Sequence, residues 1–276
     1  MTIDDQDRSW RVILDPPARG SWNMAVDDAL IESAQKPDFK PTLRLYSWEP
    51  ACLSLGHAQP IHEVDQGRLD SYGWDLVRRP TGGRAILHTD ELTYSITAST
   101  DHPLMKGGIL ESYQRISQAF LSFLKLYSLS PSSNGETNWV NKQPDPVCFE
   151  VPSNYEITVS GKKIIGSAQA RRKNAVLQHG AIPLYGDITR ITEALYYPDE
   201  GSRQNAAHRV ELRATTIETE SRITLSWDQA ADDLIHSFEV THQMTFIPGT
   251  LNEWEYETAR KIQSEKYVDP AWTGRI

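Results

Sequence analysis

The segment at residues 78–88, RRPTGGRAILH, constrains the fold more than any other part of the sequence. It lies between apolar runs at 75–77 and 92–96 that have the composition of β-strands. Pro80 cannot donate to a sheet, so it marks a strand end. Gly82 and Gly83 have no Cβ and let a ligand approach the backbone closely. The segment predicts a ligand-binding loop between strands; the alternative is a tight hairpin with incidental surface arginines.

The bulk composition is that of an ordinary globular protein. The 276 residues suit one large domain or a domain with an appendage. No apolar run is long enough to cross a bilayer, and the polar, acidic start predicts no secretory signal. Two cysteines are too few for a disulfide framework, so a cytoplasmic location is expected. The formal net charge of -9 argues against non-specific nucleic-acid binding.

Hydrophobic periodicity predicts many strands with helices inserted between them. Besides the two strands at the glycine loop, strands are expected at 10–14, 42–48, 51–56, 155–159, 162–169 and 176–184. Helices are expected at 23–35 with Asn23 as N-cap, and at 61–69, 110–127, 187–196, 227–241 and 251–266. The polar segment 205–221 is expected to be irregular. Without regular strand–helix alternation, the pattern predicts a mixed α/β fold of the α+β type rather than a doubly wound one.

Cys148 is the first candidate for covalent chemistry. It follows the proline-rich segment 144–147. The alternative is an inert buried cysteine, because reactivity requires a lowered pKa and partial exposure. Lys162 and Lys163 lie downstream, and a nearby ammonium group stabilises the nucleophilic thiolate. Cys52 lies within an apolar strand and is expected to be a core residue.

The two lysines follow a predicted hairpin turn at 160–161. Such a turn places Lys163 opposite Thr158, on the face that also carries Glu156, while Lys162 points to the other face. The alternative is that both lysines are simply solvated.

Neither His88 nor His179 has the spacing of a metal ligand relative to cysteines or carboxylates, so no metal site is expected. There is also no phosphate-binding loop of the GxxxxGK[ST] type and no Gly-x-Ser-x-Gly elbow. His179 lies in the segment QHG, before a glycine, and either faces a ligand or serves the fold.

Three segments together resemble the signatures of the biotin/lipoate protein ligase family: residues 78–88, the lysine-bearing GKKIIGSAQ at 161–169, and QHG at 178–180. The resemblance covers roughly residues 42–245. Within the family, VCFEVPSNYE at 147–156 resembles the cysteine-bearing octanoyltransferases, as does Arg84 in place of a third glycine. Another octanoyltransferase branch carries Pro-Cys-Gly, which is absent here.

The resemblance implies the fold of that catalytic domain, with a mixed, largely antiparallel sheet and surrounding helices. The catalytic domain would span 42–247. A strand and helix at 1–41 would pack on it, and a C-terminal helix and tail would occupy 248–276.

The resemblance also implies roles for individual residues. Cys148 would carry the acyl group as a thioester, and Lys163 would lower the cysteine pKa and contact the thioester carbonyl. The implied substrate-binding residues are Arg79, Gly82, Gly83, His88, Gly166, Ser167, Ala168, His179 and Gly180. Thr89 departs from the pattern, because the family usually has aspartate there.

The implied reaction moves octanoyl from acyl carrier protein to a lysine of a lipoyl-carrying protein, such as the glycine cleavage H protein. A thioester donor is already activated, so no cofactor and no ATP are expected. Such partners are often acidic, so a local basic surface is expected from Arg78, Arg79, Arg84, Lys162, Arg171, Arg172 and Lys173. The alternatives are an ATP-dependent lipoate ligase, an amidotransferase acting between lipoyl-domain proteins, and a non-catalytic binding module.

Overall fold

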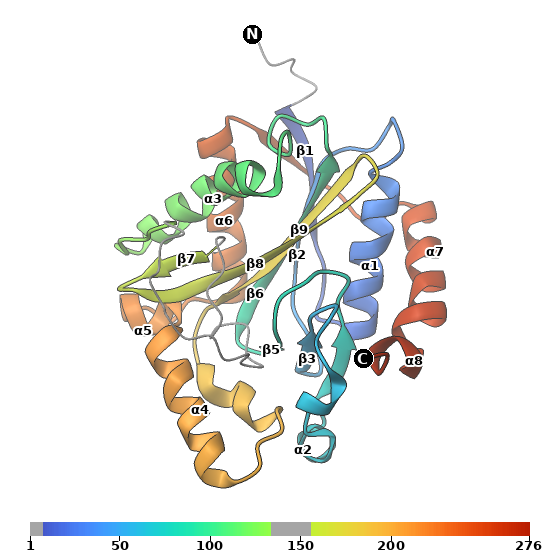
Figure 1. Ribbon diagram of the computed structural model, residues 1–276. Helices are drawn as coiled ribbons and strands as arrows, with labels where there is room; N and C mark the ends of the chain where they lie inside the picture. Colours follow the sequence, from blue (N-terminus) through green and yellow to red (C-terminus); the bar gives the residue numbers. More distant parts are fainter. Residues whose placement is uncertain (1–7, 134–155) are drawn as a thin grey trace.

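The computed structural model describes residues 8–133 and 156–276 (Figure 1). Its main sheet has seven strands in the order β10-β1-β2-β6-β9-β8-β7. These strands are Ser9–Leu14 (β1), Thr42–Tyr46 (β2), Glu91–Ser99 (β6), Glu156–Val159 (β7), Lys162–Arg172 (β8), Ala175–Pro183 (β9) and Thr245–Pro248 (β10). β1 pairs in parallel with β2 and β10, and the other pairs of this sheet are antiparallel. The predicted mixed, largely antiparallel sheet is confirmed.

A second, three-stranded sheet carries the glycine loop. Its strands are Cys52–Leu55 (β3), Asp75–Arg78 (β4) and Ile86–His88 (β5), in the order β4-β3-β5. The glycine loop joins β4 to β5, which lie on opposite edges of this sheet with β3 between them. The tight-hairpin alternative is therefore wrong, because the strands on either side of the loop are not paired with each other.

Helices cover both faces of the main sheet (Figure 1). The helices are Gly20–Ser33 (α1), Gln66–Tyr72 (α2), Ile109–Leu126 (α3), Glu200–Arg213 (α4), Ile217–Ser221 (α5), Trp227–His242 (α6), Glu253–Ile262 (α7) and Pro270–Thr273 (α8). Shorter helical segments are Ile61–Glu63, Ile188–Glu193 and Gln263–Tyr267. α3 and α6 pack on each other over one face, and α1 covers the other face with α7 outside it. Among the described residues, none of these helices combines the length and apolar character needed to cross a bilayer.

The apolar core explains most of the predicted elements. The largest cluster of buried residues joins the sheet to α3 and α6, with Phe120, Phe123 and Phe238 among its fully buried side chains. α3 begins at Ile109, one residue before the predicted start at 110. The helix was predictable because its apolar residues follow the helical period. Cys52 is completely buried, and burial raises the pKa of its thiol well above the usual value. Its prediction as a core residue is confirmed.

The first helix starts earlier than predicted. α1 begins at Gly20 with Arg19 as N-cap, so the prediction of Asn23 as N-cap is wrong. Asn23 is instead buried within the helix, where its side-chain amide donates to the carbonyl oxygens of Ala18 (3.2 Å) and Ser47 (2.9 Å). These hydrogen bonds hold the start of α1 against the chain that follows β2.

The segment 205–221 is helical, so the prediction of an irregular segment is wrong. α4 and α5 occupy most of it. α4 buries only Ala206 and Val210 and therefore lacks the apolar stripe that would reveal it. Its start is fixed locally, because Asp199 accepts a hydrogen bond from the backbone N–H of Ser202 at 2.7 Å. The short edge strand β10 was also not predicted.

Elements from both ends of the chain pack against its central part. β1 lies inside the main sheet, and α7 packs along α1. The division into 1–41, 42–247 and 248–276 stays a prediction.

Candidate active site

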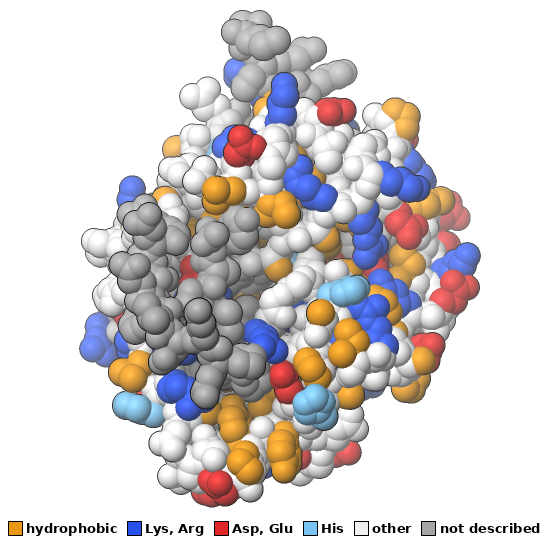
Figure 2. All heavy atoms as spheres, viewed as in Figure 1, with side chains coloured by type: hydrophobic (Ala, Val, Ile, Leu, Met, Phe, Trp, Pro, Cys, Tyr) orange, Lys and Arg blue, Asp and Glu red, His pale blue; other side chains and the backbone are white. Residues whose placement is uncertain are grey.

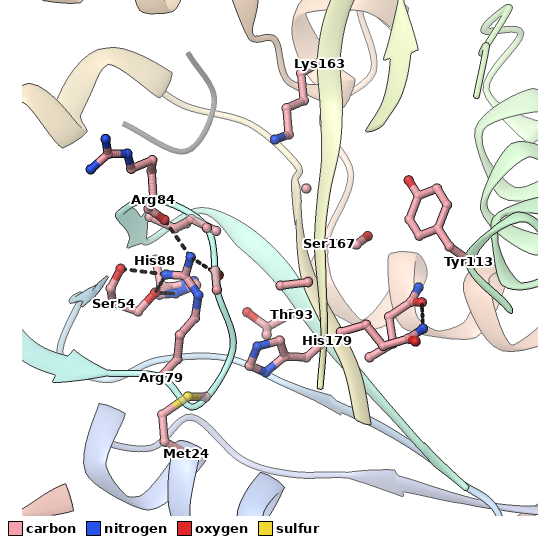
Figure 3. A pocket seen from close by; sticks show the side chains of 18 of the residues that line it. Met24, Ser54, Arg79, Arg84, His88, Thr93, Tyr113, Lys163, Ser167 and His179 are labelled. Atoms are coloured by element: carbon pink, nitrogen blue, oxygen red, sulfur yellow. Dashed lines mark hydrogen bonds between the residues drawn. The ribbon is translucent and has the colours of Figure 1, made fainter. Parts of the chain in front are cut away.

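A cavity of about 270 Å³ lies between the glycine loop and strands β8 and β9 (Figure 3). Lys163 and all nine predicted substrate-binding residues line it. Further walls come from Met24, Tyr46, Trp48, Ile86, Ile109 and Tyr113. Within the described part of the chain, no carboxylate side chain lines the cavity. Cys148 lies outside the described residues. The structure thus brings the other ten residues together, while their roles stay predictions.

Arg79 holds the glycine loop from inside (Figure 3). Its Nη2 donates to the carbonyl oxygens of Gly82 at 2.9 Å and Arg84 at 2.7 Å. Its Nη1 donates to the carbonyl oxygen of Ser54 at 2.9 Å and to the Ser54 hydroxyl at 3.2 Å. The planar guanidinium therefore ties the loop to β3, and its charge is used within the protein.

The glycine loop also depends on close backbone packing. Gly83 has a φ of 94°, a conformation that residues with a Cβ rarely adopt. A Cβ on Gly56 would lie 1.8 Å from the carbonyl oxygen of Gly83, so no side chain fits there. A Cβ on Gly82, in contrast, meets nothing within 4 Å. Gly82 therefore borders open space, and Gly83 is required for the conformation of the loop.

Arg78 and Arg79 do not contribute to a basic surface, so that part of the prediction is wrong. Arg78 is completely buried, and its Nη1 donates to the carbonyl oxygens of Gly56 (2.9 Å) and Gln59 (2.5 Å). Its Nε and Nη2 donate to the carbonyl oxygen of Thr273 at 2.9 and 2.7 Å. Unpaired carbonyl groups of loops need such donors when they are buried. On the face in Figure 2, basic and acidic side chains are interspersed.

His88, at the end of β5, has a partner at each ring nitrogen. Nδ1 lies 2.6 Å from Oε1 of Glu91, and Nε2 lies 2.7 Å from Oγ of Ser54. The ring stacks on the indole of Trp48 with centroids 4.0 Å apart. Thr93 accepts from the Trp48 indole N–H at 2.7 Å and donates to Glu91 at 2.5 Å. His88 is therefore a fixed part of the cavity wall.

His179, on β9, connects the main sheet to the glycine loop and to α1. Its Nε2 lies 2.6 Å from Oγ1 of Thr81, and its Nδ1 lies 2.9 Å from Oδ2 of Asp27. Asp27 is fully buried and also accepts hydrogen bonds from Arg44 and Tyr46, each at 3.0 Å. Burial acts to raise the pKa of Asp27, but the hydrogen bond from His179 and the charge of Arg44 outweigh it and hold that pKa below its usual value.

The remaining wall depends on the close approach of β8 and β9. A Cβ on Gly180 would lie 2.2 Å from the carbonyl oxygen of Gly166 and 2.8 Å from the ring of Tyr94. Over this glycine, the hydroxyl of Tyr94 on β6 lies 2.5 Å from Oγ of Ser167 on β8. Glycine at 180 is therefore required for the spacing of these strands.

The β7–β8 hairpin presents Lys163 to the cavity. Ser160 and Gly161 both have positive φ, 52° and 78°, as in a type I′ turn. The ladder pairs Lys163 with Thr158, which confirms the predicted register. The Nζ of Lys163 donates to Oε1 of Glu156 at 2.9 Å, and the lysine side chain is only 5% exposed. The alternative of a solvated Lys163 is wrong.

One irregularity interrupts this ladder. The register shifts between Ile157 and Thr158, which leaves Ile164 as an extra residue in β8. In an uninterrupted strand, Lys163 and Gly166 would point to opposite faces. The bulge places both on the face of the cavity.

The sequence did not identify the polar residues that hold the two histidines. Asp27 and Asp28 lie in the helix predicted at 23–35, and the structure buries both. Two carboxylates inside an apolar helical stripe are a signal of buried partners. Glu91 and Ser54 had no comparable signal, because their partner His88 comes from another strand. Among the described residues, no group of three His, Cys, Asp or Glu is arranged to hold a metal ion.

Known proteins similar to this chain were found at the level of family, sequence and structure. The family model "Lipoyl protein ligase A/B catalytic domain" matches residues 19–239. Octanoyltransferase LipM of Carboxydothermus hydrogenoformans is 37% identical over 271 residues, 97% of this chain and 99% of that protein. Octanoyltransferase LipM of Bacillus subtilis is 34% identical over 275 residues, 97% of this chain and 98% of that protein.

Solved structures give the same result. A bi-partite lipoate protein ligase from Thermoplasma acidophilum superposes with a TM-score of 0.82 at 27% identity, covering 97% of both chains. Lipoate-protein ligase A bound with ATP superposes with a TM-score of 0.80 at 27% identity, covering 97% of this chain and 100% of that one. Because the family model spans most of the sequence and the octanoyltransferases match it over nearly their whole length, the chain belongs to the lipoyl protein ligase A/B catalytic-domain family, in the branch of the LipM octanoyltransferases.

Proposed function

We propose that this enzyme moves octanoyl from acyl carrier protein, through a thioester on Cys148, to a lysine of a lipoyl-carrying protein. The observation that carries the proposal is the convergence of Lys163 and nine further predicted residues on one cavity. An octanoyl chain is uncharged, and a cavity with apolar walls binds it by removing its surface from water.

The reaction is two successive acyl transfers. First, the Cys148 thiolate attacks the carbonyl carbon of the carrier thioester; the new carbon–sulfur bond forms, the bond to the carrier sulfur breaks, and the carrier leaves as a thiol after taking up a proton. Second, the acceptor amine attacks the Cys148 thioester; the amide forms, and the cysteine sulfur leaves and receives the proton lost by the amine. The balance needs no nucleotide, because the donor thioester is already activated.

Lys163 serves both steps in this proposal. Its ammonium group stabilises the thiolate and donates a hydrogen bond to the carbonyl oxygen as negative charge develops there. The burial of Lys163 strengthens both effects, because the local dielectric is low.

The expected acceptor is the glycine cleavage H protein, with other lipoyl domains as further candidates. Of the predicted basic residues, Lys162 is half-buried and Lys173 exposed, and both remain available to acidic partners, whereas Arg84 is paired with Glu63. A cytoplasmic location belongs to the same proposal, because the reaction requires a reduced Cys148.

The test is an incubation of the enzyme with octanoyl-acyl carrier protein and apo H protein, with and without ATP. We expect ATP-independent octanoylation of the H protein and, in its absence, an octanoyl adduct that peptide mass spectrometry places on Cys148. Cys148→Ser should abolish transfer, and full activity of that variant would contradict the proposal.

A lipoate ligase is the second candidate, because a similar structure is a ligase bound with ATP. A requirement for free lipoate and ATP would favour it. A competition between octanoyl-acyl carrier protein and octanoyl-H protein as donors separates the proposal from amidotransfer between lipoyl-domain proteins.

A further inference from the structure

We infer that Glu156 is a positioning residue for Lys163: its carboxylate holds the lysine ammonium at the cavity, where the octanoyl thioester reacts. The inference rests on the proposed function, since it takes the thioester as the group that Lys163 meets. Glu156 acts through the lysine and is not assigned a contact with the substrate.

The first support is the pairing itself. The Nζ of Lys163 and Oε1 of Glu156 are 2.9 Å apart, and the two side chains are 5% and 12% exposed. A buried ammonium without a counter-charge is costly, so a lysine at this place needs a carboxylate. Glu156 supplies one without lining the cavity itself.

The second support is how the lysine is directed. A lysine side chain is a flexible four-carbon stem, so its charged end is placed only when something fixes it. The backbone of Lys163 is anchored by Thr215, whose N–H donates to the Lys163 carbonyl oxygen at 3.0 Å. The bond to Glu156 fixes the other end, and Figure 3 shows the side chain leaving β8 toward the cavity that Arg84 also lines.

The third support is the bulge in β8. Beyond it, Glu156 is opposite Gly166, while Lys163 is opposite Thr158. Glu156 and Lys163 are on one face because Lys163 is opposite Thr158, which shares a face of β7 with Glu156, and the bulge carries Gly166 to that face as well. Bulges are common next to active sites, and this one brings the ion pair and the cavity wall at Gly166 to the same face.

The same hairpin offers a matched control. Glu220 accepts hydrogen bonds from Ser160 at 2.9 Å and from Thr215 at 2.8 Å. This carboxylate supports the turn of the hairpin rather than the lysine. Glu220→Gln, on α5, therefore removes a carboxylate that contacts the hairpin and leaves the Glu156–Lys163 pair in place.

The main experiment follows acylation of the enzyme by octanoyl-acyl carrier protein in single turnovers, with intact-protein mass spectrometry. Glu156→Gln should slow acylation about tenfold or more at saturating donor, with half-saturation changed less than about twofold. Glu156→Asp should recover part of the rate, and Glu220→Gln should stay within about twofold of the parent. A Glu156→Gln variant that matches the parent, or an Asp variant as slow as the Gln variant, overturns the inference.

A double-mutant cycle separates positioning from general support of the fold. Lys163→Ala alone and Lys163→Ala with Glu156→Gln should be equally slow, because Glu156 acts only through the lysine. A further, multiplicative loss in the double variant would contradict that.

A second readout needs no acyl donor. Limited labelling with an amine-reactive acetylating reagent, followed by peptide mass spectrometry, should modify Lys163 several-fold faster in Glu156→Gln than in the parent or in Glu220→Gln. Equal labelling overturns the inference. If the parent takes no octanoyl from the carrier, the proposed function fails while the labelling still tests the pair.

Discussion

Two walls of the cavity use buried cations in different ways. On the glycine-loop side, the guanidinium of Arg79 donates to backbone carbonyl oxygens of three residues and to one hydroxyl group. On the hairpin side, Lys163 projects into the cavity and its charge is balanced by Glu156. Arg79 and Lys163 are each 4% exposed, so burial alone does not distinguish them.

The difference lies in what each cation donates to. Backbone carbonyl oxygens fix the course of the chain, and a planar guanidinium can satisfy several of them at once. A carboxylate fixes only the end of a flexible lysine. The cation of the glycine-loop wall therefore stabilises the shape of the backbone, and the cation of the hairpin wall presents a positive charge to the cavity. Each of the following changes tests that contrast.

Lys163→Met should have the largest effect on activity. We expect transfer to fall by about 10³-fold, in the range of losses for groups that act on a proton or a developing charge. Circular dichroism should show that the variant remains folded, because methionine conserves the volume of the lysine stem. A variant that unfolds, or one that transfers octanoyl normally, would remove the distinction between the walls.

Arg79→Met should show the opposite pattern. Several buried carbonyl oxygens lose their donor, so we expect the free energy of unfolding in urea to fall by about 3 kcal/mol. Arg79→Lys should recover little, because an ammonium cannot reproduce the planar set of donors. Full stability with lost activity would mean that this wall also takes part in the chemistry.

Asp27→Asn tests whether the link between α1, His179 and the glycine loop depends on a charge. The pKa of Asp27 in the folded protein lies below its unfolded value, so the ionised carboxylate stabilises the fold above about pH 4, and that contribution is lost as pH falls through the folded pKa. The variant should lose more stability at pH 7 than at pH 3. Urea denaturation across this range checks the sign; an equal loss at both values would show that charge is unimportant there.

Gly82→Ala should have the smallest effect. A methyl group there meets open space, so the change in the free energy of unfolding should be within about 1 kcal/mol. Because the residue lines the cavity, we expect a modest shift in preference among acyl chains of different length, measured with a series of acyl carriers. Gly56→Ala is the contrasting control and should be strongly destabilising, because its Cβ overlaps the Gly83 carbonyl.

The sequence predicted those parts of the site that depend on local geometry. A two-residue turn at 160–161 is enough to set Lys163 opposite Thr158, and paired glycines between strands mark the loop. The burial of Arg78 was not predictable, because its acceptors are carbonyl oxygens of distant segments, including that of Thr273. Charged residues are normally exposed, so only tertiary structure reveals such exceptions.

The helices and strands that were predicted likewise depend on local sequence. Strong apolar periods located α3 and most strands, whereas α4 buries only two side chains and is stabilised by its cap and by packing on the preceding segment Ile188–Glu193. The pairing of His179 with Asp27 joins elements 152 residues apart, which a single sequence does not relate to one another.

The bulge at Ile164 has a consequence for how this sequence tolerates change in length. Lys163 emerges on the side of the sheet that its pairing with Thr158 sets, whatever the identity of the residues that follow it. Substitutions among apolar residues at 164 and 165 preserve that pairing. Deletion of Ile164 restores a regular ladder in which Lys163 still lies opposite Thr158 and Gly166 opposite Glu156, so the lysine keeps its side. The hairpin therefore tolerates the loss of its extra residue as well as conservative replacement.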